Sequence, residues 1–300
     1  MSSSQRDDGV LVGDGGYREG MSTLDPSTSL QRTYRYLRIG IAGMVVVIFA
    51  SVGVAAASVG WLTSLSDYYY TSARTPFVGA LIAVGFALLA LSGRGLERGL
   101  LDAAALFAPL IALIPTTLAP GTIADIDLPC RFRCFPPAFE AGAANGIATY
   151  LITGTVVVIV AALLVILRQV PVASFAISGG VAIGVLAAVG LSWAFARDWV
   201  LAQGHFVATI AFFALFALVA VLAAFPRRSD PPARVFRALY IVIAVLLVAV
   251  LAAYIAFLPQ ADTLGIPLAL VAEAAALVLF SAFWIVQGIE KWSEPNPSLR

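Results

Sequence analysis

The chain has 300 residues, of which 61% are hydrophobic and only 12% are charged, and its mean hydropathy is +0.95. Soluble domains are closer to half apolar and a quarter charged, so a water-soluble fold could not bury this much apolar surface, whereas a lipid bilayer removes the need. The formal net charge is +1, which gives no large basic face and excludes nucleic acid as an expected partner.

Residues 1–36 are mostly polar and rich in Gly, Ser and Asp. They contain no basic stretch followed by a short apolar core, so this segment does not have the pattern of a signal peptide. We expect a disordered cytoplasmic tail here, and a second short cytoplasmic tail over residues 293–300.

Eight long apolar stretches follow between residues 37 and 292. A helix needs about 20 apolar residues to cross a hydrocarbon core of roughly 30 Å. Because backbone groups in lipid must be paired internally, such runs are expected to be helices, and the sequence predicts an all-α transmembrane bundle of eight spans. The second and third runs are short, so we expect them to extend into their flanks or to tilt. The predicted spans are Ile39–Leu62, Phe77–Leu91, Leu101–Leu118, Ile147–Leu167, Val172–Phe195, Phe206–Phe225, Ala238–Leu258 and Ile266–Gln287.

The link between the first two spans is the densest polar and aromatic segment outside the N-terminal tail, and it reads Ser-Leu-Ser-Asp-Tyr-Tyr-Tyr-Thr-Ser-Ala-Arg over residues 64–74. Asp67 and Arg74 are candidates for an ion pair or for holding a lipid headgroup. Three consecutive tyrosines, with Tyr69 in the middle, cannot all face one way, so at least one is expected to point inward. The alternative is that the link only anchors the chain at the membrane interface.

Two cysteines lie between the third and fourth spans, at Cys130 and Cys134. Outside the cell they meet an oxidising environment, in which disulfides persist. Three intervening residues permit closure if the Cα atoms come within about 7 Å, so we expect a disulfide. A zinc site would need two further ligands, and this loop has no histidine, so no metal is predicted.

The sixth span is expected to open with His205, the only histidine of the chain, shortly after Asp198. Histidine can carry a proton near neutral pH. The alternative is that His205 caps a helix at the outer interface.

The last span contains Glu273, seven residues from its start. At roughly 1.5 Å per residue, it lies about 10 Å below the outer surface. An ionisable group at this depth must face the bundle interior, be protonated or be paired, which makes it a candidate for function. The alternative is a purely structural hydrogen bond to a neighbouring helix.

The basic residues set the orientation. If the N-terminus lies inside the cell, fourteen of the 18 basic residues fall on the cytoplasmic side and four outside, which favours both termini in the cytoplasm of a plasma-membrane protein. The seventeen arginines and one lysine, together with abundant Ala and Val, are typical of a high-GC bacterial genome. The four outer residues are Arg74, Arg131, Arg133 and Arg197.

The two halves of the chain are weakly alike, with a boundary near residue 170. Residues 52–60 and 183–190 are similar Ala/Val/Gly runs, and both continue to an outer aspartate, Asp67 or Asp198. Four spans per half would be a parallel repeat, as some transporters have. The alternative is that such helices resemble one another by composition alone.

Three segments resemble an uncharacterised family of prokaryotic integral membrane proteins. They are the run Ser64–Thr71 with Arg74 and Phe77-Val78-Gly79, the stretch from His205 to Phe213, and the last span with Glu273 and residues 280–288. Gln287 departs from the lysine usual in that family, whose members have fewer spans. The resemblance implies a helical membrane fold and carries no activity.

A more distant similarity is to the superfamily of alkaline ceramidases and progestin/adiponectin-type receptors. Those bundles use a Ser, an Asp and three His around zinc. Asp67 and His205 match single members of that set, but this chain has no second histidine, so we expect no cofactor.

Asp67, Tyr69, Arg74, Asp198, His205 and Glu273 are all predicted toward the outer leaflet, where they would make one cavity if they converge. The leading hypothesis is a membrane protein that binds a lipid or small apolar molecule there without catalysis. The alternatives are a proton-coupled transporter that uses Glu273 and a membrane hydrolase that uses Asp67, His205 and Glu273. A homo-oligomer or another membrane protein stays open as a partner.

Overall fold

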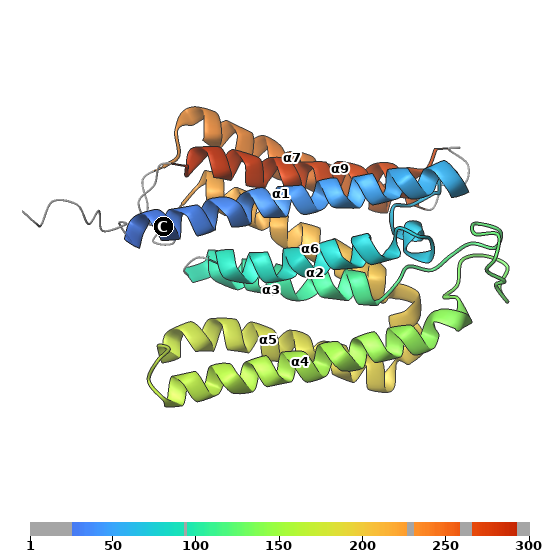
Figure 1. Ribbon diagram of the computed structural model, residues 1–300, viewed down its shortest axis with the longest axis horizontal. Helices are drawn as coiled ribbons and strands as arrows, with labels where there is room; N and C mark the ends of the chain where they lie inside the picture. The colour runs from blue at the N-terminus through green and yellow to red at the C-terminus, as the bar shows by residue number, and fades with distance from the viewer. Residues whose placement is uncertain (1–25, 93–94, 227–230, 259–265, 293–300) are drawn as a thin grey trace, which may run out of the picture.

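The structure is a computed structural model that describes residues 26–92, 95–226, 231–258 and 266–292 (Figure 1). Within these ranges the chain is all-α, and its only β-type pairing is an isolated antiparallel bridge between Leu118 and Cys134. The elements are α1 (Pro26–Val59), η1 (Ser66–Tyr70), α2 (Arg74–Leu91), α3 (Gly95–Leu113), η2 (Pro137–Phe139), α4 (Glu140–Ile166), α5 (Val172–Phe195), α6 (Arg197–Ala224), α7 (Arg234–Phe257) and α9 (Leu268–Glu290).

Seven of these helices have the length and hydropathy to cross a bilayer, as expected of a multi-pass membrane protein. The exception is α3, because its first turns carry Glu97, Arg98 and Asp102. Asp102 is nevertheless buried, 3.8 Å from the Arg98 guanidinium.

Several helix ends differ from the sequence prediction. α1 begins at Pro26, so residues 26–36, which we expected in the disordered tail, are helical, and Pro suits this first helical position. α3 ends at Leu113 rather than Leu118, because Pro115 disfavours the helical conformation of the residue before it. α6 begins at Arg197, nine residues before the predicted start, with Asp198 in a first turn that favours a carboxylate. The rest of residues 1–36 and all of residues 293–300 lie outside the described ranges.

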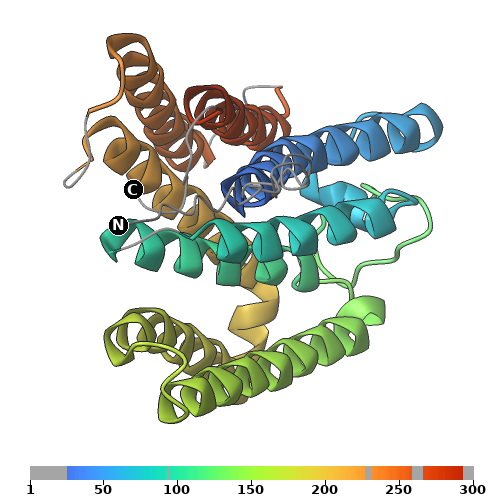
Figure 2. The same ribbon diagram turned by 60° about the vertical axis from the view of Figure 1, so that its left-hand side comes forward.

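Six helices form a closed ring in which α1, α2, α3, α6, α7 and α9 each pack against the next, and α9 packs back onto α1 (Figures 1 and 2). The main hydrophobic core lies inside this ring. The α4–α5 hairpin stands outside it and packs mainly on α3. Much of the surface of the hairpin is exposed and apolar, as suits helices surrounded by lipid.

Close packing of α2 on α3 depends on Gly85. A Cβ atom at this position would lie 3.0 Å from the carbonyl oxygen of Ala105 and 3.2 Å from Cδ of Pro109. Pro109 lies inside α3 and has no N–H to bond the Ala105 carbonyl four residues earlier. The two helices therefore touch where α3 lacks one of its own hydrogen bonds.

The connections divide between two ends of the bundle (Figure 1). The start of α1, the α4–α5 turn and the end of α9 lie at one end, together with the end of α2, the start of α3, the end of α6 and the start of α7. η1, the 114–139 loop and the α5–α6 junction lie at the other, which we call the outer end. The four basic residues predicted outside, Arg74, Arg131, Arg133 and Arg197, all lie in segments at this end. The internal duplication stays a prediction.

Candidate functional site

The chain turns back over the outer end of the bundle directly after α1. Gly60 makes this turn with a φ of +80°, a conformation that glycine adopts without strain. The Tyr68 hydroxyl fixes the turn, because it donates to the Gly60 carbonyl at 3.0 Å and accepts from the Leu62 N–H at 3.2 Å. All five residues of η1 are therefore buried, and the three tyrosines are part of the core rather than anchors at the interface.

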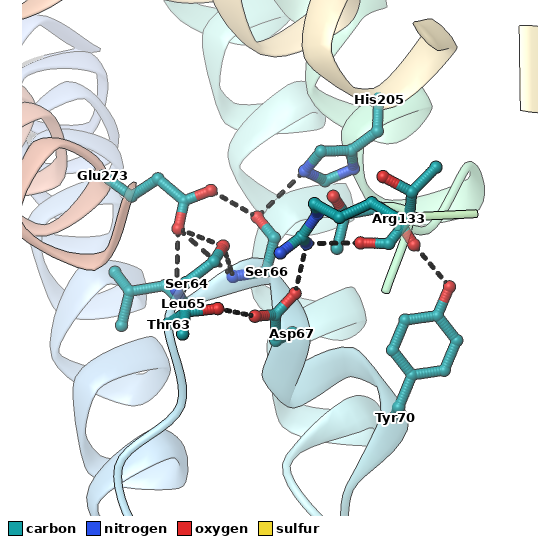
Figure 3. Close-up of polar contacts among 11 residues, drawn as sticks. Thr63, Ser64, Leu65, Ser66, Asp67, Tyr70, Arg133, His205 and Glu273 are labelled. Carbon is teal, nitrogen blue, oxygen red and sulfur yellow. Dashed lines mark hydrogen bonds and ion pairs between the residues drawn. The ribbon is translucent and has the colours of Figure 1, made fainter. Parts of the chain in front are cut away.

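Glu273 reaches from α9 into this turn (Figure 3). Its Oε2 accepts hydrogen bonds from the Ser64 hydroxyl at 2.7 Å and from the Leu65 N–H at 2.6 Å, with a longer contact of 3.3 Å to the Ser66 N–H. Its Oε1 lies 2.8 Å from the Ser66 hydroxyl. Glu273 thus faces the bundle interior, as predicted from its depth in the span, and ties the last helix to the first outer turn.

His205 approaches the same hydroxyl from α6. Its Nε2 lies 2.9 Å from Ser66 Oγ, and its Nδ1 lies 2.8 Å from the carbonyl oxygen of Ile114. The prediction that His205 opens the sixth span is wrong, because α6 begins at Arg197 and the imidazole is buried more than two turns inside it. Ser66 is the point at which α6, α9 and η1 meet.

Asp67 is fully buried beside this cluster and is paired with Arg133. Its Oδ1 accepts a hydrogen bond from Arg133 Nη2 at 2.9 Å, and its Oδ2 accepts one from the Thr63 hydroxyl at 2.8 Å. Arg133 also donates to the Thr117 carbonyl. Burial raises the pKa of Asp67 above the usual range of an aspartic acid, and the charge of Arg133 counteracts only part of that rise.

The loop that carries Arg133 is closed on itself. Cys130 and Cys134 form a disulfide with their Cα atoms 6.2 Å apart. Cys134 also exchanges two backbone hydrogen bonds with Leu118, each 2.9 Å long. The guanidinium next to this bridge is therefore held over the outer end of the bundle.

A cavity of about 1120 Å³ opens at the outer end, between α6, α7 and α9. Its walls are mainly apolar and include Phe213, Leu251 and Ala276. Its polar lining includes Ser64, His205 and Glu273, with Arg131 and Arg133 from the outer loop. A pocket of this kind, mostly apolar with a few polar groups at one place, is typical of small-molecule sites.

Aromatic side chains close the ring on the inner side of the cavity. Phe216 lies at its centre, with ring centroids 4.6 Å from Phe280 and 4.9 Å from Phe283. Trp284 joins this layer and is 1% exposed. A small apolar void of about 40 Å³ is lined by Phe280 of this layer and by Ser66 and Glu273 of the polar cluster.

The structure brings together three of the six candidate residues, Asp67, His205 and Glu273. The buried Tyr69 and the exposed Arg74 form a separate pair, in which Arg74 Nη2 donates to the Tyr69 hydroxyl at 2.8 Å and the guanidinium lies over the tyrosine ring. Arg74 therefore does not pair with Asp67. Asp198 stands apart, exposed in the first turn of α6, because that helix starts two turns above His205.

Ser64, Ser66 and Arg133 are the site residues that sequence reasoning missed. Neutral serines in a polar loop give no signal of their own, and Ser66 acquires its place only when α6 and α9 pack beside η1. The position of Arg133 beside Cys134, in a loop expected to be closed by a disulfide, is a signal that could have indicated a fixed guanidinium.

Among the described residues, no group of three or more His, Cys, Asp or Glu side chains is placed to hold a metal ion. No known protein family, curated protein or solved structure matches the chain.

Proposed function

We propose that this is a plasma-membrane protein of eight spans, with both termini in the cytoplasm, whose outer cavity binds a lipid or another amphipathic small molecule. The observation that carries the proposal is the cavity of about 1120 Å³ between α6, α7 and α9. α3 counts as the eighth span, because it lies in the ring between α2 and α6 and joins links at opposite ends of the bundle.

The chemistry of the lining favours an amphipathic ligand with an anionic head. The apolar walls suit a hydrocarbon chain, and the polar groups gather at the outer end. Arg131 is exposed on the cavity wall and makes no ion pair with any residue that the structure describes. A guanidinium in this position can bind a carboxylate or phosphate with two parallel hydrogen bonds.

A proton-coupled transporter is the second candidate, and the hydrogen-bonded chain from Glu273 through Ser66 to His205 favours it. It ranks behind simple binding, because the aromatic layer around Phe216 separates the cavity from the inner half of the ring.

A hydrolase ranks third. Ser66 and His205 are within hydrogen-bond distance, as a nucleophile and its base would be. However, Ser66 is 6% exposed and is not on the wall of the large cavity. Asp67 bonds to Thr63 and Arg133 instead of to His205 or Glu273.

Binding can be tested with oleate and monoolein, which share one acyl chain and differ in the charge of the head. The purified protein in nanodiscs is expected to bind both, and oleate more tightly. Ala272→Trp fills the cavity and should reduce binding at least tenfold, whereas Val271→Trp, on the exposed face of the same helix, should leave it unchanged. Equal binding by the protein and by Ala272→Trp, or no binding of either lipid, would overturn the proposal.

A further inference from the structure

The Ser66 hydroxyl lies between two ionisable side chains, at hydrogen-bond distance from both. Ser66 Oγ is 2.8 Å from Glu273 Oε1 and 2.9 Å from His205 Nε2. The other imidazole nitrogen, Nδ1, faces the carbonyl oxygen of Ile114 at 2.8 Å. A carbonyl only accepts, so Nδ1 must carry a proton in any arrangement that keeps these contacts.

Counting protons then restricts the charge state of the cluster. Ser66 has one hydroxyl proton and can donate to only one neighbour, so the other neighbour must bring a proton of its own. Either Glu273 is a carboxylic acid that donates to Ser66 while Ser66 donates to a neutral His205, or His205 is an imidazolium that donates to Ser66 while Ser66 donates to a Glu273 carboxylate. If neither brought a proton, two lone pairs would face each other at a hydrogen-bond distance.

The two arrangements have the same net charge and differ by one concerted transfer. The Glu273 Oε1–H bond breaks as that proton bonds to Ser66 Oγ, and the original hydroxyl proton of Ser66 bonds to His205 Nε2. A carboxylic acid and an imidazole become a carboxylate and an imidazolium, and Ser66 is unchanged at the end.

The neighbouring titratable groups take no part in this proton transfer. Asp67 and Arg133 neutralise each other beside the cluster, and the Asp67 oxygens are taken by Arg133 and Thr63. Tyr254 lines the same cavity from α7, and Arg131 stands on its wall. The other oxygen of Glu273 accepts from Ser64 and from the backbone, so it stays bonded in both arrangements.

We propose that Glu273, Ser66 and His205 form a relay that holds one shared proton, and that this relay couples the protonation of His205 and Glu273 to occupancy of the outer cavity. Both end groups line the cavity, whereas the Ser66 hydroxyl that connects them is buried behind its wall. A ligand that contacts one end therefore changes the proton at the other end. The coupling to occupancy rests on the proposed function, but the shared proton does not.

The shared proton can be tested without any ligand, because His205 is the only histidine of the chain. Selective ¹⁵N labelling of histidine gives the spectrum of one imidazole, and the infrared band of a protonated carboxyl that disappears in Glu273→Gln reports Glu273. Between about pH 5 and 8, the fraction of imidazolium should equal the fraction of Glu273 carboxylate at every pH. Neutral His205 together with ionised Glu273 at any pH in this range would overturn the relay.

Two variants test the bridging role of Ser66. Ser66→Ala should uncouple the two groups, so that the imidazole and carboxyl signals change at different pH values. Ser64→Ala is the matched control, because it removes a hydrogen bond to the other oxygen of Glu273 and leaves the bridge in place. In Glu273→Gln, the amide can replace the carboxylic acid as a donor to Ser66, and His205 should stay neutral throughout. Coupling that survives in Ser66→Ala would overturn the proposal.

The link to the cavity is tested by adding oleate or monoolein to the labelled protein. Binding should change the His205 and Glu273 signals together and in opposite senses, and Ser66→Ala should bind the same lipid without this paired change. If neither lipid binds, the proposed function fails while the ligand-free result still decides the relay. If a lipid binds and neither signal moves, the coupling to occupancy is wrong.

Discussion

Glu273 is a cross-link between the two ends of the described chain as well as a member of a polar cluster. Four hydrogen bonds reach its carboxylate from residues 64–66, more than 200 positions earlier in the sequence. The Leu270 N–H adds a backbone bond of 3.0 Å to the Thr63 carbonyl one turn away. The first outer turn and the last helix therefore depend on each other for their backbone hydrogen bonds.

Glu273→Ala should destabilise the protein by on the order of 2 kcal/mol, because it leaves the Leu65 N–H and the Ser64 hydroxyl without their acceptor. Glu273→Gln keeps an acceptor at this position and should cost clearly less. Thermal unfolding in detergent, followed by tryptophan fluorescence, measures both. Equal losses for Ala and Gln would mean that the carboxylate charge, and not the hydrogen bonds, holds the turn.

Arg133→Ala should destabilise the protein by roughly 2–3 kcal/mol at neutral pH, less than the loss of a partner from a fully buried pair, because Arg133 reaches solvent. The loss arises because the variant leaves the buried Asp67 carboxylate without its counter-ion. The pKa of Asp67 is already raised in the folded protein, and removing Arg133 should raise it further.

The sign of the pH dependence follows from this raised pKa. A carboxyl that holds its proton more firmly when folded favours the folded state at low pH, and this contribution is lost as the pH rises through the folded pKa. The deficit of Arg133→Ala should therefore grow as the pH rises above the raised pKa that Asp67 already has in the unmodified protein, and it should be small in more acidic solution. Asp67→Asn in the same background should remove that dependence. A deficit that is constant with pH would show that Arg133 acts through packing or through Thr117 alone.

At the scale of helices, the glycines differ in how much an added methyl group should destabilise the packing. Gly85 faces the Ala105 backbone oxygen, which cannot move aside, at a Cβ distance of 3.0 Å. Gly154 in α4 faces the end of the Leu186 side chain at 2.6 Å, which can rotate. The rigidity of the neighbour, rather than the shorter distance, should decide the cost of a methyl group.

Gly85→Ala should therefore cost roughly 1–2 kcal/mol, and Gly154→Ala should cost less despite its closer contact. Gly79→Ala, on the same helix as Gly85 but with no atom near its Cβ, is the control, and it should be neutral or stabilise the protein by up to about 1 kcal/mol. Thermal midpoints of the three variants give the comparison. A larger loss for Gly154 than for Gly85 would contradict this account of α2–α3 packing.

Element ends were harder to predict than element type, and α6 shows why. The apolar run starts at Phe206, but the helix starts at Arg197, because the mixed polar and apolar residues 197–205 continue the helix. The inward face of those residues is set by α3, whose end brings the Ile114 carbonyl to His205. Hydropathy identifies the apolar run, and it carries no information about whether the helix extends past the end of that run.

At the scale of the whole molecule, the arrangement of the helices predicts which loops lie on the same side of the membrane. Single cysteines can be introduced without altering the native pair, because Cys130 and Cys134 are joined to each other. A membrane-impermeant maleimide should label Ala124→Cys in intact cells, and should label Ser92→Cys and Gln169→Cys only after permeabilisation. Opposite sides for Ser92 and Ala124 would establish that α3 crosses the membrane, and labelling of Gln169→Cys in intact cells would reverse the orientation.

The helical class and most of the long helices could be predicted from hydropathy, because each apolar run is long enough to be read on its own. The depth of Glu273 also indicated that it faces inward. The site could be predicted only in part. Asp67, His205 and Glu273 stood out because charged groups are rare in this chain, whereas the serine that connects two of them is common and neutral. Contacts across a ring of helices depend on packing between distant segments. The periodicity within one segment does not predict them.

The short bridge between Cys130 and Cys134 has a practical consequence for anyone who prepares this protein. Arg133 directly precedes Cys134, so a thiol reductant added during purification would free the loop that holds Arg133 against Asp67. The long helices would stay folded. Such a sample would look well folded by circular dichroism although the position of Arg131 and Arg133 on the cavity wall had changed. Lipid binding should therefore be measured on material kept oxidised from lysis onward.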